Sequence, residues 1–471
     1  MSKHVFWTVA IGMLLAHLAL ATAMPPMPDE LYYWCWAKEL QFSYYDHPPA
    51  TAYLIWASTA IFGDTLLAVR LPACLCMFGV VLMMGQIARP HWPLVLLPLT
   101  PLCLFGGILM TPDAPLVCAW MAYLVWLTEL HHRLDADEAG ADWQLWTLGG
   151  IALGLGILSK YTMGLAGLTA AASLVTARPW RQWLGGFLLH GVVAFVVSLP
   201  ILLYNIQTDF APLRYQWEHT MEVAEPSIRF LPEYVGGQVL LVGWLPFTLT
   251  LWLLWNWRML SADPRLRACL WMFVAPSLFF LYKAARDRIE LNWPVPCYLA
   301  FAPLAAHWFE QMANRPVLRW LGFSSFTIPI VATGVIAWHL VNPIGFLPPE
   351  KDRLHVCSSW TTMAQQIDAT MKATDPGAPV YTSTYQNVSY LRFAGVNAHQ
   401  ALGLSRPSHF THNPLPMHEQ EYFYFVDHHP RDFSGFSPPR LLARFPLLTR
   451  GQEVATFSLF RYDRLSSSRA H

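Results

Sequence analysis

The stretch of sequence that decides the fold is VFWTVAIGMLLAHLALATAM at residues 5–24, which the acidic pair Asp29-Glu30 follows closely. An apolar run of this length can cross the hydrocarbon core of a bilayer as one helix. Lys3 in front of it and Ala21-Thr22-Ala23 at its end also match the pattern of a cleaved signal peptide. Because many more apolar stretches follow, we expect this segment to be retained as the first membrane helix.

Apolar stretches of similar length recur along most of the chain. They lie at about 64–88, 92–109, 113–131, 144–158, 161–177, 183–204, 236–257, 266–282, 293–309 and 319–341. Together with the first stretch they predict an α-helical polytopic membrane protein with roughly eleven transmembrane helices.

The composition of the 471 residues supports this class. Hydrophobic residues make up 55% of the chain and charged residues only 13%, which is too few for the surface of a soluble protein. Thirty Lys and Arg balance thirty Asp and Glu, and this zero net charge excludes a strongly basic nucleic-acid-binding protein. We therefore expect membrane lipids, and no nucleic acid, among the partners.

Arginine residues fall in alternate connections between the predicted spans, as expected if those connections face the cytoplasm. The N-terminus is then cytoplasmic, and the odd number of spans places the C-terminus outside. The arginines in the cytoplasmic connections are Arg89, Arg133, Arg178, Arg181, Arg258, Arg265, Arg267, Arg315 and Arg319. We expect a multi-pass protein of the cytoplasmic (inner) membrane with a periplasmic C-terminal domain.

From about residue 343 the composition becomes polar, and no further span-length apolar run occurs. We therefore expect a small extracytoplasmic α/β domain over residues 343–471. The transmembrane domain is expected over residues 1–342, including the first outer loop at 25–63. The C-terminal elements predicted from the sequence are strands at 379–382, 422–426 and 455–460 and a helix around 389–393.

Ionisable side chains gather at the outer ends of the predicted spans, although such groups are costly near lipid and usually face a cavity. A carboxylate could act there as a general base, and cations could bind a phosphate. A lipid-linked phosphosugar needs both, because its acceptor must lose a proton and its phosphate must leave. The residues concerned are Asp29, Glu30, Asp46, His47, Asp113, Lys160, Glu218, His219, Lys283, Arg286, Asp287, Arg288 and Glu290.

Each of these charges also has a structural interpretation. Asp29-Glu30 could end a helix at the water boundary, Asp113 could cap the start of a helix, and Lys160 could extend to lipid headgroups. Glu218-His219 could be a solvated loop pair, and Arg286 with its basic neighbours could contact headgroups. Their accumulation on one face of a charge-poor protein favours a shared functional site instead.

Several short motifs follow one another along the chain. They are Asp29-Glu30 with Tyr32-Tyr33-Trp34, Tyr44-Tyr45-Asp46-His47-Pro48-Pro49, Phe62-Gly63-Asp64, Arg70-Leu71-Pro72, Thr111-Pro112-Asp113-Ala114-Pro115, Gly154-Leu155-Gly156-Ile157-Leu158-Ser159-Lys160-Tyr161, Tyr234-Val235-Gly236-Gly237-Gln238 and Glu290-Leu291-Asn292-Trp293-Pro294-Val295-Pro296-Cys297-Tyr298. In this order they resemble the polytopic GT-C glycosyltransferases that use polyprenyl-phosphate sugars (glycosyltransferase family 39), such as protein O-mannosyltransferases and lipid A aminoarabinose transferases. The resemblance covers about residues 1–310 and rests on the order and spacing of the motifs.

This resemblance implies roles for individual acidic residues. Asp29 matches the residue that acts as general base toward the acceptor, and Glu30 would help to shape the site. Asp46 matches a second acid near the carrier phosphate, which in some relatives binds a divalent metal together with a histidine of a later loop. His219 is the candidate for that histidine here, so a divalent ion such as Zn, Mg or Mn is a candidate cofactor.

The resemblance also implies residues that contact the donor phosphate. Relatives such as the aminoarabinose transferases carry lysine where this chain has His47, and histidine titrates near neutral pH. His47 could therefore contact the phosphate, contact a metal or form a neutral hydrogen bond. The phosphate candidates are Lys160, Arg286, Arg288 and His47. The acceptor or substrate candidates, which lie in the shared motifs, are Asp113, Tyr33, Gln238 and Asn292.

In the C-terminal domain, Tyr385-Gln386-Asn387 and Ser405-Arg406-Pro407-Ser408 resemble segments of some bacterial relatives, without an implied chemistry. We expect this domain to cover the active-site opening or to help select the acceptor. Its histidines show no metal-ligand spacing, and we interpret them as solvated surface residues. They are His355, His399, His409, His412, His418, His428 and His429.

These observations predict an inverting glycosyltransferase that moves a hexose or pentose from a polyprenyl-phosphate carrier to a lipid, glycan or protein acceptor at the outer face of the cytoplasmic membrane. Because the related class inverts, we expect direct displacement with one base rather than the paired carboxylates of a retaining enzyme. The alternatives are a transporter or flippase of a lipid-linked substrate and a non-catalytic assembly subunit. Inverted repeats would favour the transporter, and the sequence shows none.

Overall fold

The structure is a computed structural model that describes residues 3–87, 99–138, 142–177, 179–221, 228–412 and 414–465. Its internal contacts divide the chain into two compact units. The first, here called the membrane unit, comprises Met1–Ala21, Gln41–Ser43 and His47–Ala337. The second, here called the α/β unit, comprises Thr22–Leu40, Tyr44–Asp46 and Trp338–His471.

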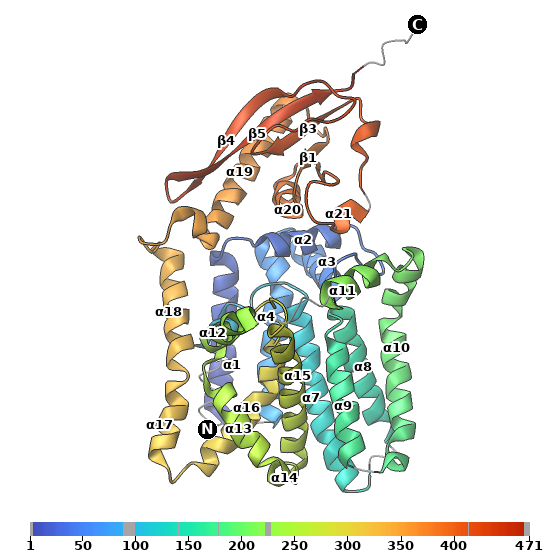
Figure 1. Cartoon of the computed structure of the whole chain (residues 1–471), viewed down its shortest axis with the longest axis vertical. Helices are drawn as coiled ribbons and strands as arrows, with labels where there is room; N and C mark the ends of the chain where they lie inside the picture. Colours follow the sequence, from blue (N-terminus) through green and yellow to red (C-terminus); the bar gives the residue numbers. More distant parts are fainter. Residues whose placement is uncertain are drawn as a thin grey trace. The chain divides into compact units, whose positions relative to one another are not determined.

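The membrane unit is built from helices (Figure 1). Their bounds are α1 (Lys3–Ala23), α3 (Ala50–Phe62), α4 (Leu66–Ile87), α6 (Pro101–Leu104), α7 (Asp113–Asp135), α8 (Trp143–Ser159), α9 (Met163–Ala177), η3 (Trp180–Gln182), α10 (Leu184–Gln207), α11 (Ala211–Met221), η4 (Ile228–Phe230), α12 (Leu231–Val242), α13 (Leu245–Trp255), α14 (Trp257–Leu260), α15 (Pro264–Ala284), α16 (Val295–Gln311), α17 (Pro316–Ser324) and α18 (Thr327–Val341), where η marks a 3-10 helix.

Five of the described helical segments are long and apolar enough to cross a membrane, namely α1, α4, α10, α15 and the α17–α18 pair. Shorter apolar helices are α3, α8 and α9. The chain is therefore a multi-pass membrane protein, as predicted, while the number of eleven spans stays a prediction. Residues 92–98 of the stretch predicted at 92–109, together with Arg89 and Arg178, lie outside the described residues.

The span predicted over residues 236–257 is not one continuous helix in the structure, and whether the segment crosses the membrane stays a prediction. The segment forms α12 and α13, which are bent by 97° at a short break. Gly243 in the break has a φ of +86°, a left-handed conformation that costs little only for glycine. Pro246 then lies in the first turn of α13, where its missing N–H loses no helical hydrogen bond.

Helix α7 lies inside the membrane unit and packs against α4, α8, α9, α15 and α16. Its Trp120, Tyr123 and Leu127 are almost fully buried. Helix α8 also packs closely against α10 (Figure 1). This approach requires glycine at Gly150 and Gly154, because a Cβ atom at either position would lie only 2.6 Å from atoms of α10. Small residues allow membrane helices to approach one another in this way.

Contacts at one end of the membrane unit agree with the predicted sidedness of the helices. Arg267 at the start of α15 donates to both carboxylate oxygens of Asp135 at the end of α7, each at 3.1 Å. Arg265 donates to the backbone carbonyl of Ile87 at the end of α4 at 3.2 Å. The predicted topology places all four residues on the same side, so the alternation of helix directions is internally consistent.

The α/β unit contains a five-stranded sheet in the order β2–β1–β3–β5–β4. The pairings β2–β1 and β1–β3 are parallel, and β3–β5 and β5–β4 are antiparallel. Pro446 lies in the edge strand β4, where a missing N–H is tolerated. The elements of this unit are α2 (Pro28–Lys38), η5 (Pro349–Lys351), α19 (Arg353–Thr374), β1 (Val380–Thr382), α20 (Tyr385–Ala394), β2 (Ala398–Gln400), α21 (His409–His412), η6 (Met417–Glu419), β3 (Tyr422–Asp427), β4 (Arg440–Thr449) and β5 (Gln452–Asp463).

The sheet is held by an aromatic core that includes Tyr381, Phe423, Phe425 and Tyr462. Helices α19 and α20 pack against its strands. The predicted strands are confirmed as parts of β1, β3 and β5, and the predicted helix as part of α20. Strands β2 and β4 and helix α19 were not predicted. The predicted fold class, a helical membrane protein with a small α/β domain, is confirmed.

Helix α2 belongs to the α/β unit, although it follows the first membrane helix directly in sequence. It packs against α20, where the ring of Trp34 lies 4.9 Å from the ring of Phe393. The hydroxyl of Tyr390 on α20 donates to the backbone carbonyl of Pro26 at 2.9 Å. This packing fixes the start of α2, where Asp29 and Glu30 lie.

Candidate functional site

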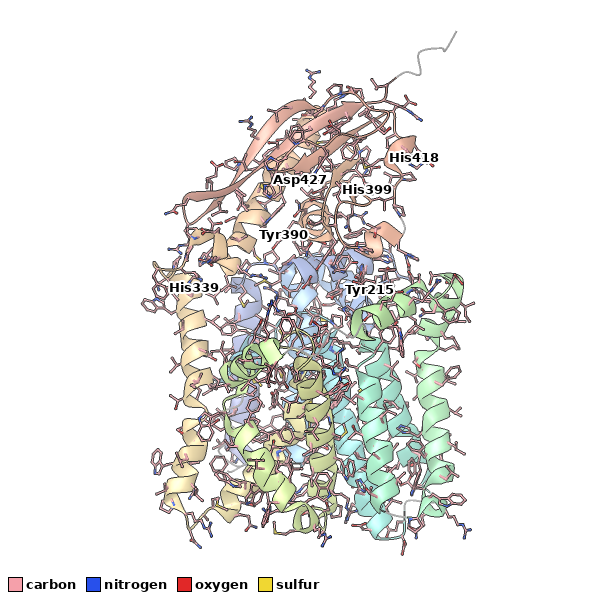
Figure 2. The ribbon with its side chains drawn as sticks, viewed as in Figure 1. Tyr215, His339, Tyr390, His399, His418 and Asp427 are labelled. Atoms are coloured by element: carbon pink, nitrogen blue, oxygen red, sulfur yellow. The ribbon has the colours of Figure 1, made fainter. Side chains whose placement is uncertain are left out.

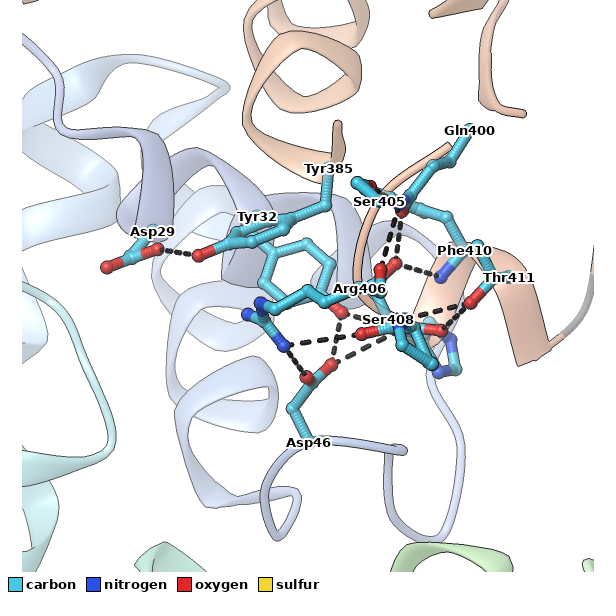
Figure 3. Close-up of polar contacts among 12 residues, drawn as sticks. Asp29, Tyr32, Asp46, Tyr385, Gln400, Ser405, Arg406, Ser408, Phe410 and Thr411 are labelled. Atoms are coloured by element: carbon cyan, nitrogen blue, oxygen red, sulfur yellow. Dashed lines mark hydrogen bonds and ion pairs between the residues drawn. The ribbon is translucent and has the colours of Figure 1, made fainter. Parts of the chain in front are cut away.

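Asp29 and Glu30 both lie in the first turn of α2, where the helix dipole favours acidic residues. Their surroundings differ. Glu30 is fully buried and accepts a hydrogen bond from the backbone N–H of Met27 at 3.1 Å, so it stabilises the start of the helix. Asp29 is exposed to solvent, and its Oδ1 accepts a hydrogen bond from the hydroxyl of Tyr385 at 2.9 Å (Figure 3).

Asp46 is buried, and both of its carboxylate oxygens accept hydrogen bonds (Figure 3). Oδ1 accepts one from Nη1 of Arg406 at 3.0 Å. Oδ2 accepts one from the hydroxyl of Tyr32 and another from the backbone N–H of His409, the latter at 3.2 Å. Within the α/β unit, Asp46 is therefore bonded to two residues of the C-terminal part of the chain, Arg406 and His409.

Arg406 connects the surroundings of the two carboxylates. Its guanidinium lies over the ring of Tyr385 at 4.5 Å, and the hydroxyl of Tyr385 binds Asp29. The side-chain amide of Gln400 donates to the backbone carbonyl of Arg406 at 3.2 Å and fixes this loop. The side chain of Arg406 is 46% exposed, whereas that of Asp46 is 7% exposed. The anion of this ion pair is therefore buried, and its cation is exposed to solvent.

The protein raises the pKa of both carboxyl groups above the ordinary value. For Asp29, an exposed residue, the main cause is desolvation by the surrounding protein, and the hydrogen bond from Tyr385 and the charge of Arg406 oppose the increase. For Asp46 the cause is burial, opposed by Tyr32 and Arg406. A raised pKa makes Asp29 a stronger base, and the cation beside it favours its ionised form.

In the membrane unit, Asp113, Lys160 and Asn292 come together although they lie far apart in sequence. Nζ of Lys160 donates to Oδ1 of Asp113 at 2.8 Å, and Nδ2 of Asn292 donates to Oδ2 at 2.6 Å. Asp113 is the first residue of α7 and its side chain does not cap the helix, so the interpretation of Asp113 as a helix cap was wrong. Lys160 is buried in this pair rather than extended to the surface.

Gln238 on α12 stabilises the segment that carries Asn292. It is fully buried, and its Nε2 donates to the backbone carbonyl of Leu291 at 3.1 Å. Its Oε1 accepts a hydrogen bond from the hydroxyl of Tyr298 at 2.9 Å. Because Leu291 immediately precedes Asn292, the amide of Gln238 helps to set the position of Asn292.

Arg286 and Arg288 lie in the loop after α15 and have other partners. The guanidinium of Arg286 lies over the ring of Tyr282 at 4.6 Å. Nε of Arg288 pairs with Oε1 of Glu233 at 3.1 Å, and both side chains are exposed. This exposed ion pair is weak enough for an anionic ligand to compete with it.

The remaining predicted site residues have varied surroundings. Tyr33 on α2 is buried, with its ring 4.8 Å from that of Trp36, so it takes part in packing. His47 is half-buried. His219 lies in α11, but its side chain is outside the part of the chain that the structure describes.

Within the described residues, the side chains of His339, Asp352 and His355 form a group that could hold a metal ion. His339 lies at the end of α18 (Figure 2), and its Nδ1 accepts a hydrogen bond from the backbone N–H of Ile344 at 3.0 Å. Its Nε2 therefore carries a proton and donates to Asp352 at 3.0 Å. Burial acts to raise the pKa of Asp352, but hydrogen bonds from His355 and His339 outweigh it, and the pKa is lowered. The predicted metal ligand Asp46 is not part of this group.

The interpretation of the C-terminal histidines as solvated surface residues was wrong for His355, which bonds to Asp352, and for His409. His409 is 7% exposed, and burial lowers its pKa to about 3, so its ring stays neutral. Its backbone N–H, rather than its ring, contacts the carboxylate of Asp46.

Tyr385 and Arg406, the partners of Asp29 and Asp46, were not predicted to take part in the site. Both lie in the segments noted as similar to bacterial relatives, and this was the available signal. The structure adds the partners: Tyr385 binds Asp29, and Arg406 binds Asp46.

The chain matches the family model described as dolichyl-phosphate-mannose-protein mannosyltransferase over residues 46–204. One relative is the lipid A galacturonosyltransferase RgtD of Rhizobium johnstonii, which is 25% identical over 339 residues, or 69% of this chain and 68% of the relative. Another is the undecaprenyl phosphate-alpha-4-amino-4-deoxy-L-arabinose arabinosyl transferase of Pseudomonas aeruginosa, which is 26% identical over 322 residues. That alignment covers 65% of this chain and 58%, less than two thirds, of the relative.

Solved structures show the same fold. The crystal structure of ArnT from Cupriavidus metallidurans bound to undecaprenyl phosphate matches with a TM-score of 0.65 at 14% identity, over 98% of each chain. The apo state of the same protein matches with a TM-score of 0.62 at 16% identity, over 90% of this chain and 93% of that one. The resemblance inferred from the motifs is thus confirmed at the level of the fold.

Proposed function

We propose that this protein is a member of the glycosyltransferases that use polyprenyl-phosphate sugars, and that it transfers a sugar from undecaprenyl phosphate to lipid A or a similar glycolipid. The ArnT-type fold and the similarity to two transferases named for lipid A or undecaprenyl-phosphate sugars support this proposal. The observation that carries it is Asp29, an exposed carboxylate of raised pKa that is bonded to Tyr385 and lies in the field of Arg406.

In the proposed reaction Asp29 removes the proton from the attacking oxygen of the acceptor. That oxygen forms a bond to the anomeric carbon of the sugar while the bond between this carbon and the carrier phosphate breaks. The phosphate oxygen takes the bonding electron pair, and the configuration at the anomeric carbon is inverted. The hydroxyl of Tyr385 positions the carboxylate of Asp29 through its hydrogen bond. The proton taken up by Asp29 is then released to water.

The other predicted residues are proposed to bind the two substrates. The leaving phosphate gains negative charge, so it requires cations. We assign this role to Lys160, Arg286 and Arg288, with His47 as a further contact. We assign the acceptor or the sugar to Asp113 and Asn292, with Gln238 acting by positioning the segment of Asn292; the buried residues Tyr33 and Glu30 support Asp29 by stabilising α2.

We propose that the protein lies in the cytoplasmic membrane with its N-terminus in the cytoplasm and residues 343–471 in the periplasm, while residues 1–342 form the membrane domain. The distribution of arginine over the connections supports this orientation. Alkaline phosphatase fused after the C-terminus should be active in cells, and green fluorescent protein at the same place should be dark. The reverse result would contradict the orientation.

The function is tested with the purified full-length protein in lipid nanodiscs. Labelled undecaprenyl-phosphate aminoarabinose and undecaprenyl-phosphate galacturonic acid serve as donors and lipid A as acceptor. We expect transfer by the wild type from one donor and a loss of about a thousandfold in Asp29→Asn, because a positioned base contributes on that order. Asp463→Asn, at an exposed position of β5, is the matched control and should keep full activity.

Three results would contradict the proposal: no transfer from either donor, unchanged transfer in Asp29→Asn, or equal losses in Asp29→Asn and the control. Movement of the carrier lipid between leaflets without transfer would instead support a flippase.

A further inference from the structure

The carboxylate of Asp46 is engaged on both oxygens by groups of the protein itself. Tyr32 and the backbone N–H of His409 donate to Oδ2, and the same N–H lies 2.6 Å from the hydroxyl of Tyr32. These two neutral donors hold the carboxylate in one orientation. The donor to Oδ1 is the permanent cation of Arg406, at 3.0 Å.

A divalent ion at Asp46 would have to displace these donors. Metal sites in proteins need several ligands, each with a lone pair directed at the ion. Across the described residues, the group of three His, Cys, Asp or Glu side chains with such geometry is His339–Asp352–His355, and Asp46 does not belong to it. A guanidinium at 3.0 Å from Asp46 would also repel the ion. The surroundings of Asp46 therefore fit a cation supplied by the protein better than a bound metal.

The exposed side of Arg406 suits a phosphate. Its side chain is 46% exposed although its carboxylate partner is buried, so a ligand can approach the guanidinium from solvent. A guanidinium presents its N–H groups in a plane that matches two oxygens of a phosphate. Asp46 and the ring of Tyr385, 4.5 Å away, hold that plane in place before the ligand arrives.

We propose that Arg406 supplies, at Asp46, the positive charge that a divalent metal would otherwise supply, and that it binds the phosphate of the polyprenyl carrier as the sugar leaves. This inference rests on the proposed glycosyl transfer. Arg406 then contacts the substrate, and Asp46 is a positioning residue that holds Arg406. Because the guanidinium is permanently charged, the transfer requires no metal ion.

The first test measures metal directly, independently of turnover. The full-length protein, purified without added metal, should contain by plasma mass spectrometry no divalent ion beyond the one that His339, Asp352 and His355 could hold. Treatment with EDTA, followed by its removal, should leave the transfer rate unchanged. One bound ion per chain that EDTA removes together with activity would overturn the inference.

The second test measures binding of undecaprenyl phosphate by native mass spectrometry. Arg406→Met should weaken binding about ten- to hundredfold, because hydrogen bonds between charged groups are lost. The affinity of Arg406→Lys should lie between those of the wild type and Arg406→Met, since lysine keeps the charge but lacks the planar guanidinium. Arg444→Met, at an exposed position of β4, is the matched control and should bind as the wild type does.

The double variant Asp46→Asn/Arg406→Met separates loss of binding from the small loss of stability expected for Arg406→Met, because it also removes the carboxylate that is left without its cation. It should fold and still bind the carrier weakly. If the wild type transfers sugar but both Arg406 variants bind the carrier as tightly as it does, the inference is wrong and the proposed function stands. If the wild type binds the carrier through Arg406 but transfers no sugar, the proposed function fails and the phosphate site stands.

Discussion

Two carboxylate–cation pairs, one in each unit, are similar in length but differ in exposure. Asp46 and Arg406 are 3.0 Å apart, and Asp113 and Lys160 are 2.8 Å apart. In the membrane unit both side chains are mostly buried, with 16% and 10% exposed. In the α/β unit the carboxylate is 7% exposed and the cation 46%. The exposed cation of the α/β pair can meet a phosphate from solvent, whereas the buried cation of the membrane pair is held by its carboxylate until a ligand competes for it.

The neighbours of each pair explain this difference. In the membrane unit Asn292 donates to the second oxygen of Asp113 at 2.6 Å and so ties three separate segments together. In the α/β unit Tyr32 and the backbone of His409 satisfy the carboxylate from its buried side, which leaves Arg406 facing solvent. We expect loss of the membrane pair to cost more stability, because both of its charges are buried, and loss of the α/β pair to act mainly on the charge offered to the substrate.

The largest effect on stability is expected for Asp113→Ala. This change leaves the buried ammonium of Lys160 without its partner, and breaking a buried pair in this way costs about 3–5 kcal/mol of unfolding free energy. Denaturant unfolding in detergent measures the loss. The double variant Asp113→Ala/Lys160→Met should recover most of it. If Asp113→Ala alone is as stable as the wild type, Asp113 and Lys160 do not form a buried ion pair in the membrane unit.

A smaller loss, about 1 kcal/mol or less, is expected for Arg406→Met in the same unfolding measurement. Water can replace the exposed guanidinium, and Asp46 keeps its hydrogen bonds from Tyr32 and His409. The variant should nevertheless lose most of its carrier binding. A stability loss as large as that of Asp113→Ala would remove the distinction between the two pairs.

The smallest expected effect is a shift in the pH dependence of transfer in Tyr385→Phe. Asp29 must be unprotonated to act as a base, so kcat/KM falls as the pH falls through its pKa. The hydrogen bond from Tyr385 lowers that pKa, so its removal should move the acid limb to higher pH, by less than about one unit. Tyr422→Phe on β3 is the control and should leave the limb in place. A limb that stays, or moves to lower pH, in Tyr385→Phe would contradict the contact with Asp29.

The sequence predicted that Asp113, Lys160 and Asn292 belong to the site, because the signals for them are local, but it did not predict their mutual contacts. Asp113, Lys160 and Asn292 each lie at the end of an apolar run, so hydropathy and topology placed them on one side of the membrane, and the structure joins them. Asp29 and Asp46 were recognised from short motifs near the first helix. Their roles stay predictions, because only their positions are described.

The sequence did not predict the partners of Asp29 and Asp46, because those contacts are not local. Arg406 lies 360 residues from Asp46, and Tyr385 lies 356 residues from Asp29. Their proximity depends on the packing of α2 against α20, which no pattern within either segment indicates. The bend at Gly243 was missed for a different reason, since one glycine scarcely changes the hydropathy of an apolar run.

The most direct test of the central claim, that Asp29 is the base for transfer of a sugar to a membrane glycolipid, is the mass spectrum of lipid A and related glycolipids from cells. Cells that lack this protein are complemented at equal expression with the wild type or with Asp29→Asn. We predict a glycolipid heavier by one sugar with the wild type and its absence with Asp29→Asn. The same glycolipid profile from both strains would contradict the claim.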